Sequence, residues 1–197
     1  MTALPLQPVG DRAARLTIPA GVSRAALLDW LLAQPGVRDA SLAAEHALIV
    51  VDGTPPAQLV LPALDAIPAP LGREHRVEVV YDGDDLDEVA VLAGLASREE
   101  VIARHVARPL EVSFLGFCPG FAYLVGLDEA LAAVPRRSDP RVRVPPGSVA
   151  IAGGYGGIYP AALPGGWRLL GRAVGLDLLA RERPHFAVGD RVRFVPV

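Results

Sequence analysis

The sequence has very few of the residues and runs that mark secreted, metal-binding or membrane proteins. It contains one cysteine, Cys118, in 197 residues, so it can form no internal disulfide, and no His/Cys cluster shows zinc spacing. Its formal net charge is -3, whereas nucleic-acid-binding proteins gather Lys and Arg on one face. We therefore expect no nucleic-acid partner and a reducing, cytoplasmic compartment.

Long apolar runs are also missing. Each one is interrupted by Pro, Gly or charge well short of a membrane span. The segment from Met1 to Pro5 shows no basic region followed by an apolar core. We expect a chain that is neither secreted nor membrane-spanning. With 51% hydrophobic and 21% charged residues, it can bury an ordinary core as one large domain or two small ones.

The first third of the chain alternates strand and helix signals. Ser23 precedes an apolar stripe as an N-cap, which predicts a helix that ends at Pro35-Gly36. Another helix is predicted after Thr54-Pro55. The predicted strands are residues 15–18, 37–42 and 47–51. The prolines and glycine of residues 68–72 predict a linker. The predicted domains are residues 1–75 and 76–197.

The second domain begins with a predicted strand at residues 77–81. Asp85 can cap a short helix, and Ser97 with Glu100 makes a capping box for a helix that runs to about Arg108. Glycines and prolines then recur between short β-branched or aromatic runs, a pattern typical of strands and ordered loops. The predicted strands are residues 110–117, 148–152, 167–170 and 191–195. A closed or nearly closed β-barrel is the expected architecture, because it removes unpaired sheet edges.

Three glycine-rich segments, residues 116–121, 153–157 and 164–167, are candidate binding loops. Glycine allows positive φ and lets backbone amides approach a ligand, so these loops can form oxyanion or phosphate nests. They have neither Walker A nor dinucleotide-binding spacing. From the residues alone, corners of a barrel are the favoured interpretation. The aromatic residues beside them either line a site or cover an open end of the barrel; these are Phe117, Phe121, Tyr123, Tyr155, Tyr159 and Trp167.

Arginines cluster near these loops. An extended strand points alternate residues to the same side, and an arginine fork suits a carboxylate or a phosphate. The cluster comprises Arg136, Arg137, Arg141 and Arg143. His105 lies on the apolar face of its predicted helix, where a structural role is favoured. For Cys118, packing under a loop is favoured over nucleophilic chemistry. The residues alone nominate no complete catalytic set.

Several segments of the second domain form one ordered set of motifs. They are Phe114-Leu115-Gly116-Phe117-Cys118-Pro119-Gly120-Phe121-Ala122-Tyr123-Leu124, Pro135-Arg136-Arg137, Pro140-Arg141, Val144-Pro145-Pro146-Gly147-Ser148-Val149, Gly157-Ile158-Tyr159-Pro160 and Pro164-Gly165-Gly166-Trp167-Arg168-Leu169-Leu170-Gly171-Arg172. This set closely resembles the family of the 5-oxoprolinase B subunit (carboxyltransferase domain, subdomains C and D). The family also contains the bacterial sensor-kinase inhibitor KipI and allophanate hydrolase subunit 1.

The resemblance implies an α+β fold, in which a small α+β N-terminal domain is followed by a cyclophilin-like β-barrel. It also implies two partner proteins, one with a cyclophilin-like fold that resembles the 5-oxoprolinase C subunit and one that resembles the 5-oxoprolinase A subunit. In that complex ATP with Mg²⁺ drives the opening of 5-oxo-L-proline to L-glutamate, and no tightly bound cofactor is expected in this chain. The alternatives are a KipI-like inhibitor of a sensor histidine kinase and a carboxyltransferase or allophanate hydrolase component that acts on urea or a related amide.

The resemblance also places candidate site residues. His105 and Arg141 stand where the family motif has His and Arg, so they are the expected catalytic residues. The expected substrate-binding residues are Phe117, Pro119, Gly120, Phe121, Tyr123, Arg136, Pro145, Gly147, Ser148, Tyr155, Tyr159 and Arg172.

The chain departs from the family motif at four positions near the expected site. Tyr155 and Gly156 replace the usual Gln and Thr, Leu163 replaces Ser or Thr, and Ala173 replaces Thr. Each change removes a hydrogen-bonding group, and a site built on such groups can lose about 1 to 3 kcal/mol per unpaired partner. The barrel is expected to tolerate these changes better than the activity does.

Overall fold

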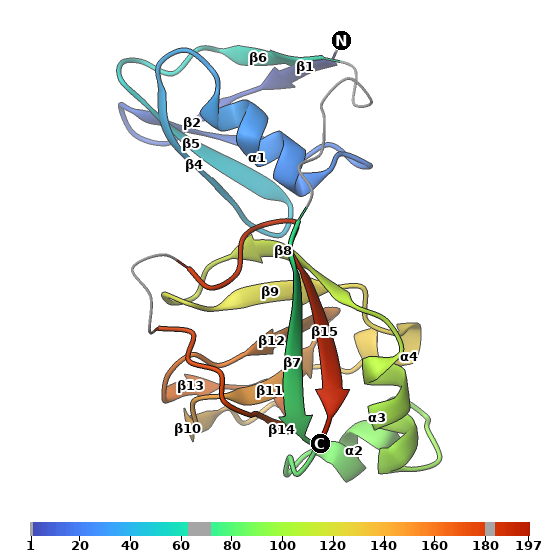
Figure 1. Ribbon diagram of the computed structural model, residues 1–197. Helices are drawn as coiled ribbons and strands as arrows, with labels where there is room; N and C mark the ends of the chain where they lie inside the picture. Colours follow the sequence, from blue (N-terminus) through green and yellow to red (C-terminus); the bar gives the residue numbers. More distant parts are fainter. Residues whose placement is uncertain (1, 63–71, 180–183) are drawn as a thin grey trace. The chain divides into compact units, whose positions relative to one another are not determined.

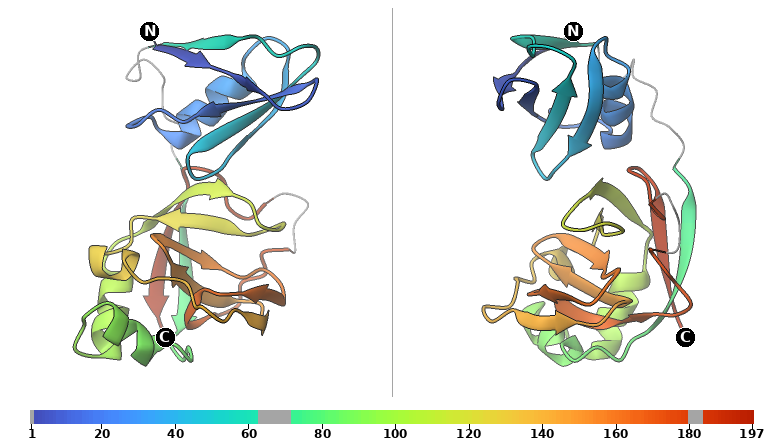
Figure 2. Two further views of the ribbon diagram at one scale, coloured as in Figure 1. Left: turned by 180° about the vertical axis from the view of Figure 1, so that it is seen from behind. Right: turned by 90° about the vertical axis from the view of Figure 1, so that its left-hand side faces the viewer.

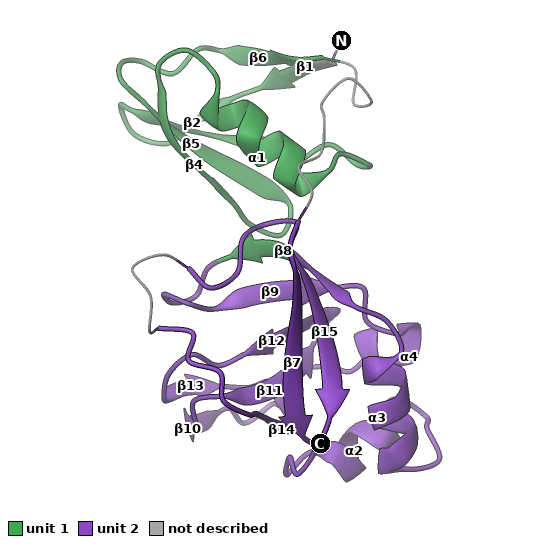
Figure 3. Ribbon diagram, in the orientation of Figure 1, with its two compact units in different colours: residues 1–71, 113–115 green, residues 72–112, 116–197 purple. Residues whose placement is uncertain are grey.

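The computed structural model describes residues 2–62, 72–179 and 184–197. The chain divides into two compact units, residues 1–71 with 113–115 and residues 72–112 with 116–197 (Figure 3). The linker predicted at residues 68–72 lies outside the described residues except for Gly72, and the predicted domain limits stay a prediction. No helix among the described residues has the length and apolar character that crossing a membrane requires.

The first unit contains a four-stranded antiparallel sheet and a separate pair of strands (Figure 1). The sheet has the order β2-β3-β5-β4, and β1 pairs with β6. The elements are β1 (Thr2–Pro5), β2 (Gln7–Pro8), β3 (Ala13–Thr17), α1 (Arg24–Leu32), β4 (Val37–Leu42), β5 (His46–Val51) and β6 (Gln58–Leu61). Helix α1 begins as predicted, because the Ser23 hydroxyl accepts a hydrogen bond of 3.3 Å from the amide of Ala26.

The helix predicted after Thr54-Pro55 is wrong. Only residues 57–61 lie between Pro56 and Pro62, which is too short a stretch to offset the cost of helix nucleation. Residues 58–61 form β6, which pairs antiparallel with β1 and buries Leu61 completely. Strand pairing therefore satisfies the backbone groups that a helix would have paired internally.

The second unit is built on a closed barrel with the strand order β11-β12-β9-β8-β15-β7-β14 (Figure 2). A separate two-stranded sheet pairs β10 with β13. The strands are β7 (Glu74–Val80), β8 (Leu110–Leu115), β9 (Ala122–Val125), β10 (Arg141–Val144), β11 (Ser148–Ala152), β12 (Tyr155–Ile158), β13 (Leu163–Gly165), β14 (Arg168–Ala173) and β15 (Arg191–Pro196). The α+β class, the barrel and the predicted strands are confirmed, with small shifts at strand ends.

Strand β15 closes the barrel. It pairs in parallel with β7 over its whole length, from Arg191 opposite Glu74 to Pro196 opposite Val79. On its other edge it pairs antiparallel with the start of β8. Two segments separated by more than a hundred residues of chain therefore form one seam of the sheet.

Three helices accompany the barrel: α2 (Leu86–Leu92), α3 (Arg98–Val106) and α4 (Glu129–Ala132). The predicted N-cap of α3 is confirmed, since the Ser97 hydroxyl accepts a hydrogen bond of 3.3 Å from the Glu100 amide. The Glu100 carboxylate accepts from the amide of Ala96, one residue earlier than a capping box requires. Helices α2 and α3 pack against each other, with α2 on β14 and α3 on β15 (Figure 1).

Candidate functional site

Most of the predicted site residues line one of two hollows of the second unit, and these hollows share no lining residue. The first, the aromatic pocket, has a volume of about 90 Å³ and is lined by Phe117, Phe121, Tyr123, Arg136, Tyr159 and residues 164–167. The second, the basic cleft, has a volume of about 350 Å³, and its lining includes Arg141, Arg143, Pro145, Ser148 and Arg172. The single cleft expected from the sequence is therefore two separate sites.

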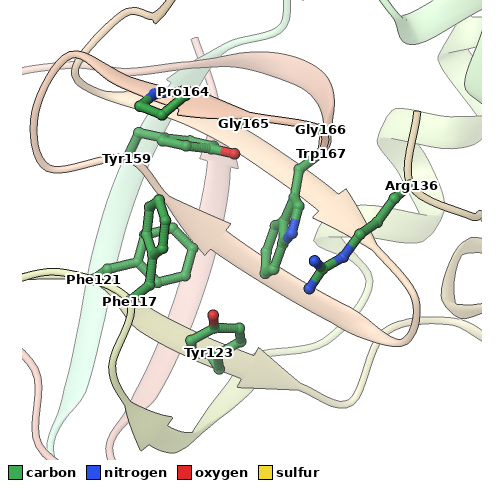
Figure 4. Close-up of a pocket in the computed structure, with 9 residues that line it drawn as sticks. All are labelled: Phe117, Phe121, Tyr123, Arg136, Tyr159, Pro164, Gly165, Gly166 and Trp167. Atoms are coloured by element: carbon green, nitrogen blue, oxygen red, sulfur yellow. The ribbon is translucent and has the colours of Figure 1, made fainter. Parts of the chain in front are cut away.

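Phe121 lines the aromatic pocket and contacts several of its other rings (Figure 4). Its ring centroid lies 5.1 Å from that of Tyr123, 5.4 Å from that of Trp167 and 5.6 Å from that of Tyr159, all in edge-to-face geometry. Such contacts add to the stability gained from burying the rings. Phe117 completes the wall from the loop between β8 and β9, with 57% of its surface exposed and with a positive φ of 68°. A bulky residue rarely adopts that conformation.

Glycines make room for these rings. A Cβ at Gly157 would lie 2.8 Å from the Phe121 ring, and one at Gly165 would overlap the Tyr159 hydroxyl. Gly153 and Gly154 have positive φ angles of 54° and 88° in the turn between β11 and β12. At these four positions the structure supports close packing and a tight turn, the interpretation that the residues alone favoured.

Arg136 supplies the positive charge of the aromatic pocket. Its guanidinium points into the space between Trp167 and Tyr123 (Figure 4). Among the described residues it makes no hydrogen bond or ion pair, and the residue is exposed. Burial raises the pKa of Tyr159 against the opposing effects of a hydrogen bond from the Trp167 backbone and of the Arg136 charge. Burial also raises the pKa of Tyr123. The pocket thus combines flat apolar walls and neutral phenols with one cation, which suits a small ring that carries a carboxylate.

Arg141 is engaged by a buried carboxylate. Asp85 is 2% exposed and accepts hydrogen bonds of 2.9 Å from each terminal nitrogen of Arg141. It also accepts bonds of 3.0 Å from Arg137 and 2.7 Å from the amide of Leu169. Burial opposes ionisation, but these hydrogen bonds and the two arginine charges outweigh it and hold the pKa of Asp85 below its usual value. Arg141, which the sequence predicts to bind an anion, is therefore already paired with a carboxylate of its own chain.

His105 lies inside the protein, on α3, and is 1% exposed. Its Nδ1 is 2.7 Å from the Tyr81 hydroxyl, and its ring stacks 4.6 Å from Phe194. Its Nε2 has no hydrogen-bond partner among the residues that the structure describes. Burial lowers the pKa of His105 to about 4, so the imidazole is neutral at pH 7. It lines neither hollow, and its catalytic role stays a prediction.

Four further predicted residues line neither hollow. Pro119 and Gly120 lie in the loop between β8 and β9, where Gly120 has a φ of 83° and approaches Leu179. Gly147 turns the chain into β11 with a φ of 79°. Tyr155 packs behind the pocket with its ring 5.6 Å from that of Tyr123.

Cys118 packs against the same aromatic cluster. Burial raises the pKa of its thiol, and a hydrogen bond donated by the Phe121 backbone N–H opposes this effect. The thiol is therefore protonated at pH 7, which agrees with the packing role favoured from the sequence.

The site residues predicted from the sequence omit Trp167 and Arg143, which line the hollows, and Asp85, which lines neither of them. Trp167 is predicted only as one of the aromatic residues and Asp85 only as a cap, although Asp85 holds the arginine segment in place. Arg143 lines the basic cleft with Arg141. Strand alternation could have found it, because residues 141 and 143 of one strand face the same side. No group of three or more potential metal-binding side chains comes together within the described ranges.

Comparison with known proteins assigns the family. The family model described as carboxyltransferase domain, subdomain C and D, matches residues 5–186. The chain belongs to this family. It is 46% identical over 132 residues to the 5-oxoprolinase B subunit of Escherichia coli O157:H7, an alignment that covers 64% of this chain and 60% of that protein. The chain thus spans well under two thirds of that relative.

Two solved structures agree with the fold. The crystal structure of TTHA0988 superposes with a TM-score of 0.75 and 37% identity, over 95% of this chain and 40% of that one. The Kluyveromyces lactis urea amidolyase superposes with a TM-score of 0.69 over 98% of this chain and 15% of that one. Its identity is only 18%, so this second likeness supports the fold alone.

Proposed function

We propose that this chain is one component of an ATP-dependent amidohydrolase of the 5-oxoprolinase type, which opens 5-oxo-L-proline to L-glutamate. The observation that carries the proposal is the aromatic pocket with the unpaired guanidinium of Arg136. The family, and the name of the Escherichia coli relative as a 5-oxoprolinase B subunit, support the same substrate class.

The pocket and the proposed substrate match in size and chemistry. A volume of about 90 Å³ admits only a compact ligand, since drug-sized ligands occupy about 300 Å³ or more. 5-Oxo-L-proline is a five-membered lactam with one carboxylate. In the proposed binding mode its ring lies against the aromatic side chains that line the pocket, and its carboxylate pairs with Arg136. A guanidinium and a carboxylate form charge-assisted hydrogen bonds, which are stronger than neutral ones.

Activation of the amide is assigned to the complex rather than to this chain. The Cys118 thiol is protonated and His105 is sealed in the core, so neither offers a ready nucleophile or base at the pocket. ATP with Mg²⁺ supplies the activation when it is bound in a complex with proteins that resemble the 5-oxoprolinase C and A subunits. This chain binds and orients the lactam.

The test uses this chain co-purified with the protein of the same genome that resembles the C subunit, with and without the protein that resembles the A subunit. Glutamate formation and 5-oxoproline-dependent ATP hydrolysis are measured together. Arg136→Gln is expected to lower kcat/KM about 10- to 100-fold, because it removes a charged hydrogen-bond partner of the substrate. The matched control is Arg12→Gln, an exposed arginine of the first unit, which should match the wild type. Turnover that is unaffected by Arg136→Gln contradicts the proposed pocket.

One observation favours a second candidate, a KipI-like inhibitor of a sensor histidine kinase. Gly156 stands where the family motif has Thr, and a Cβ at this position would lie only 3.1 Å from Leu110. At position 156, close packing against Leu110 therefore takes the place of the hydrogen-bonding side chain of the family motif. A stable complex without turnover, together with slower autophosphorylation of a kinase encoded nearby, would support this candidate. A biotin carboxylase encoded nearby would instead point to a carboxyltransferase acting on urea or a related amide.

A further inference from the structure

The basic cleft contains one arginine without a counter-ion among the described residues. Arg141 is held by Asp85 at 2.9 Å, and the Nε of Arg172 donates to Asp82 at 2.9 Å. Arg143 is exposed and makes no hydrogen bond or ion pair with any described residue. Its charge is therefore available to a ligand.

A serine on the same cleft also lacks a partner. Ser148 is 5% exposed and lines the cleft at the start of β11. Its backbone N–H donates to Pro145 and its carbonyl accepts from Tyr159, but within the described part of the chain its hydroxyl makes no hydrogen bond. The hydroxyl is not among the fully buried polar atoms of the described residues that lack a partner, so it reaches the cleft and can donate to an acceptor oxygen of a bound group.

Strands β10 and β11 bring Arg143 and Ser148 to the same cleft. Residues 141 and 143 share a face of β10, and Ser148 lies opposite Arg172 in the pairing of β11 with β14.

Two carboxylates also line the cleft. Asp82 is paired with Arg172, and Asp84 is 81% exposed and lies 3.9 Å from Arg141. Arg141 already pairs with Asp85, so it compensates Asp84 only in part, and Arg143 is the arginine of the cleft lining that has no carboxylate partner among the described residues.

We propose that the basic cleft binds a tetrahedral oxyanion of the phosphate class, with Arg143 as its cationic partner and the Ser148 hydroxyl as a neutral donor. The volume of about 350 Å³ admits inorganic phosphate or the phosphoryl group of a small molecule. A tetrahedral oxyanion offers acceptor oxygens to the guanidinium and the hydroxyl at the same time. This site stands on the cleft alone and does not depend on the proposed function.

The test is titration of the full chain with inorganic phosphate and, separately, with acetyl phosphate, followed by calorimetry. Wild-type protein is expected to bind at least one probe, and preference between them identifies the free anion or an acyl phosphate as the ligand. Arg143→Gln and Ser148→Ala are each expected to weaken binding about tenfold or more. Arg143→Lys should recover part of the loss because it restores the charge.

Arg12→Gln is the control for charge, and thermal unfolding of each variant verifies its fold. The proposal is overturned if neither probe binds at millimolar concentration. It is also overturned if Arg12→Gln weakens binding as much as Arg143→Gln does, or if sodium chloride at equal ionic strength abolishes binding, since both results indicate non-specific attraction. Absence of glutamate formation overturns the proposed function without affecting this result.

Discussion

His105 shows how burial sets the behaviour of a single residue. The side chain is 1% exposed, and its contacts are the Tyr81 hydroxyl and the Phe194 ring. Nothing among these described contacts stabilises a positive charge. The imidazole must therefore lose its proton when the protein folds at mildly acidic pH, whereas the unfolded chain keeps it.

We predict that His105 makes the stability of the protein fall on mild acidification. Its pKa is 6.5 in the unfolded chain and about 4 in the folded protein. Between these values the unfolded state binds more protons, so the free energy of unfolding decreases as the pH falls from 6.5 to 4. The loss amounts to about 3 kcal/mol. Denaturant unfolding at several pH values, compared between wild type and His105→Leu, should show that this component is absent from the variant.

Tyr81→Phe is the matched control for this prediction. It removes the hydrogen bond to Nδ1 but leaves the buried imidazole, so it should keep most of the pH dependence. An equally steep pH dependence in His105→Leu would show that other groups cause the effect.

At the scale of elements, Asp85 joins parts of the second unit that are distant in sequence. It lies at the N-terminus of α2, and its carboxylate binds Arg141 of β10, Arg137 of the preceding loop and the Leu169 amide of β14. The amide of Arg137 in turn donates to the carbonyl of Gly166 at 2.7 Å. The segment that carries Arg136 is therefore fixed at the aromatic pocket by this carboxylate.

We predict that Asp85→Asn lowers the free energy of unfolding by about 2 to 3 kcal/mol. Breaking a buried pair commonly costs about 3 to 5 kcal/mol, and the value is reduced here because the side chains of Arg137 and Arg141 are 27% and 20% exposed. The control Asp87→Asn removes an exposed pair with Arg98 and should change stability far less than Asp85→Asn does, because solvent screens exposed ion pairs. Equal effects of the two variants in denaturant unfolding would contradict the role of Asp85.

The same residue also has a pH signature. Because the folded-state pKa of Asp85 lies below 3.8, its contribution is present above pH 3.8 and is lost as the pH falls through the folded value. Asp85→Asn should lack this component of acid unfolding.

Sequence patterns predicted elements better than they predicted contacts. The Ser23 and Ser97 caps depend on local residues, and so do the predicted barrel strands β7, β8, β11, β14 and β15, and the structure has them; the barrel strands β9 and β12, which lie among the glycine-rich segments, were not predicted. Segment 57–61 has no strong local preference, and its strand exists because β1 lies beside it. The arginine cluster is evident in the sequence, but its division between Asp85, the aromatic pocket and the basic cleft depends on contacts between distant strands. The order of residue types along the chain does not say which distant strands pair with each other.

At the scale of the whole molecule, closure of the barrel depends on one strand. Strand β15 fills the gap between β7 and β8, and it buries Val192 and Phe194 to 0% and 2% exposure. Without β15, both neighbouring strands would have an unpaired edge, and the apolar interior beneath them would be exposed.

We predict that a chain ending after Asp190 loses the cooperative unfolding of the second unit. The near-ultraviolet circular dichroism of the aromatic cluster around Trp167 should weaken, and binding of a hydrophobic dye should increase. A chain that lacks only Val197, which is 62% exposed, should behave as the full chain does. A sharp unfolding transition in the longer truncation would show that the barrel tolerates an open seam.

The same parallel seam has a consequence for biosynthesis. Strand β7 leaves the ribosome long before its partner β15 has been translated, because residues 81–190 are made in between. Until then the aromatic residues between 117 and 167 belong to an open sheet, and long-range pairing of this kind is slow to form. The nascent chain should therefore engage chaperones late in translation, and rare codons placed just before residue 191 should prolong that exposure and reduce the yield of folded protein.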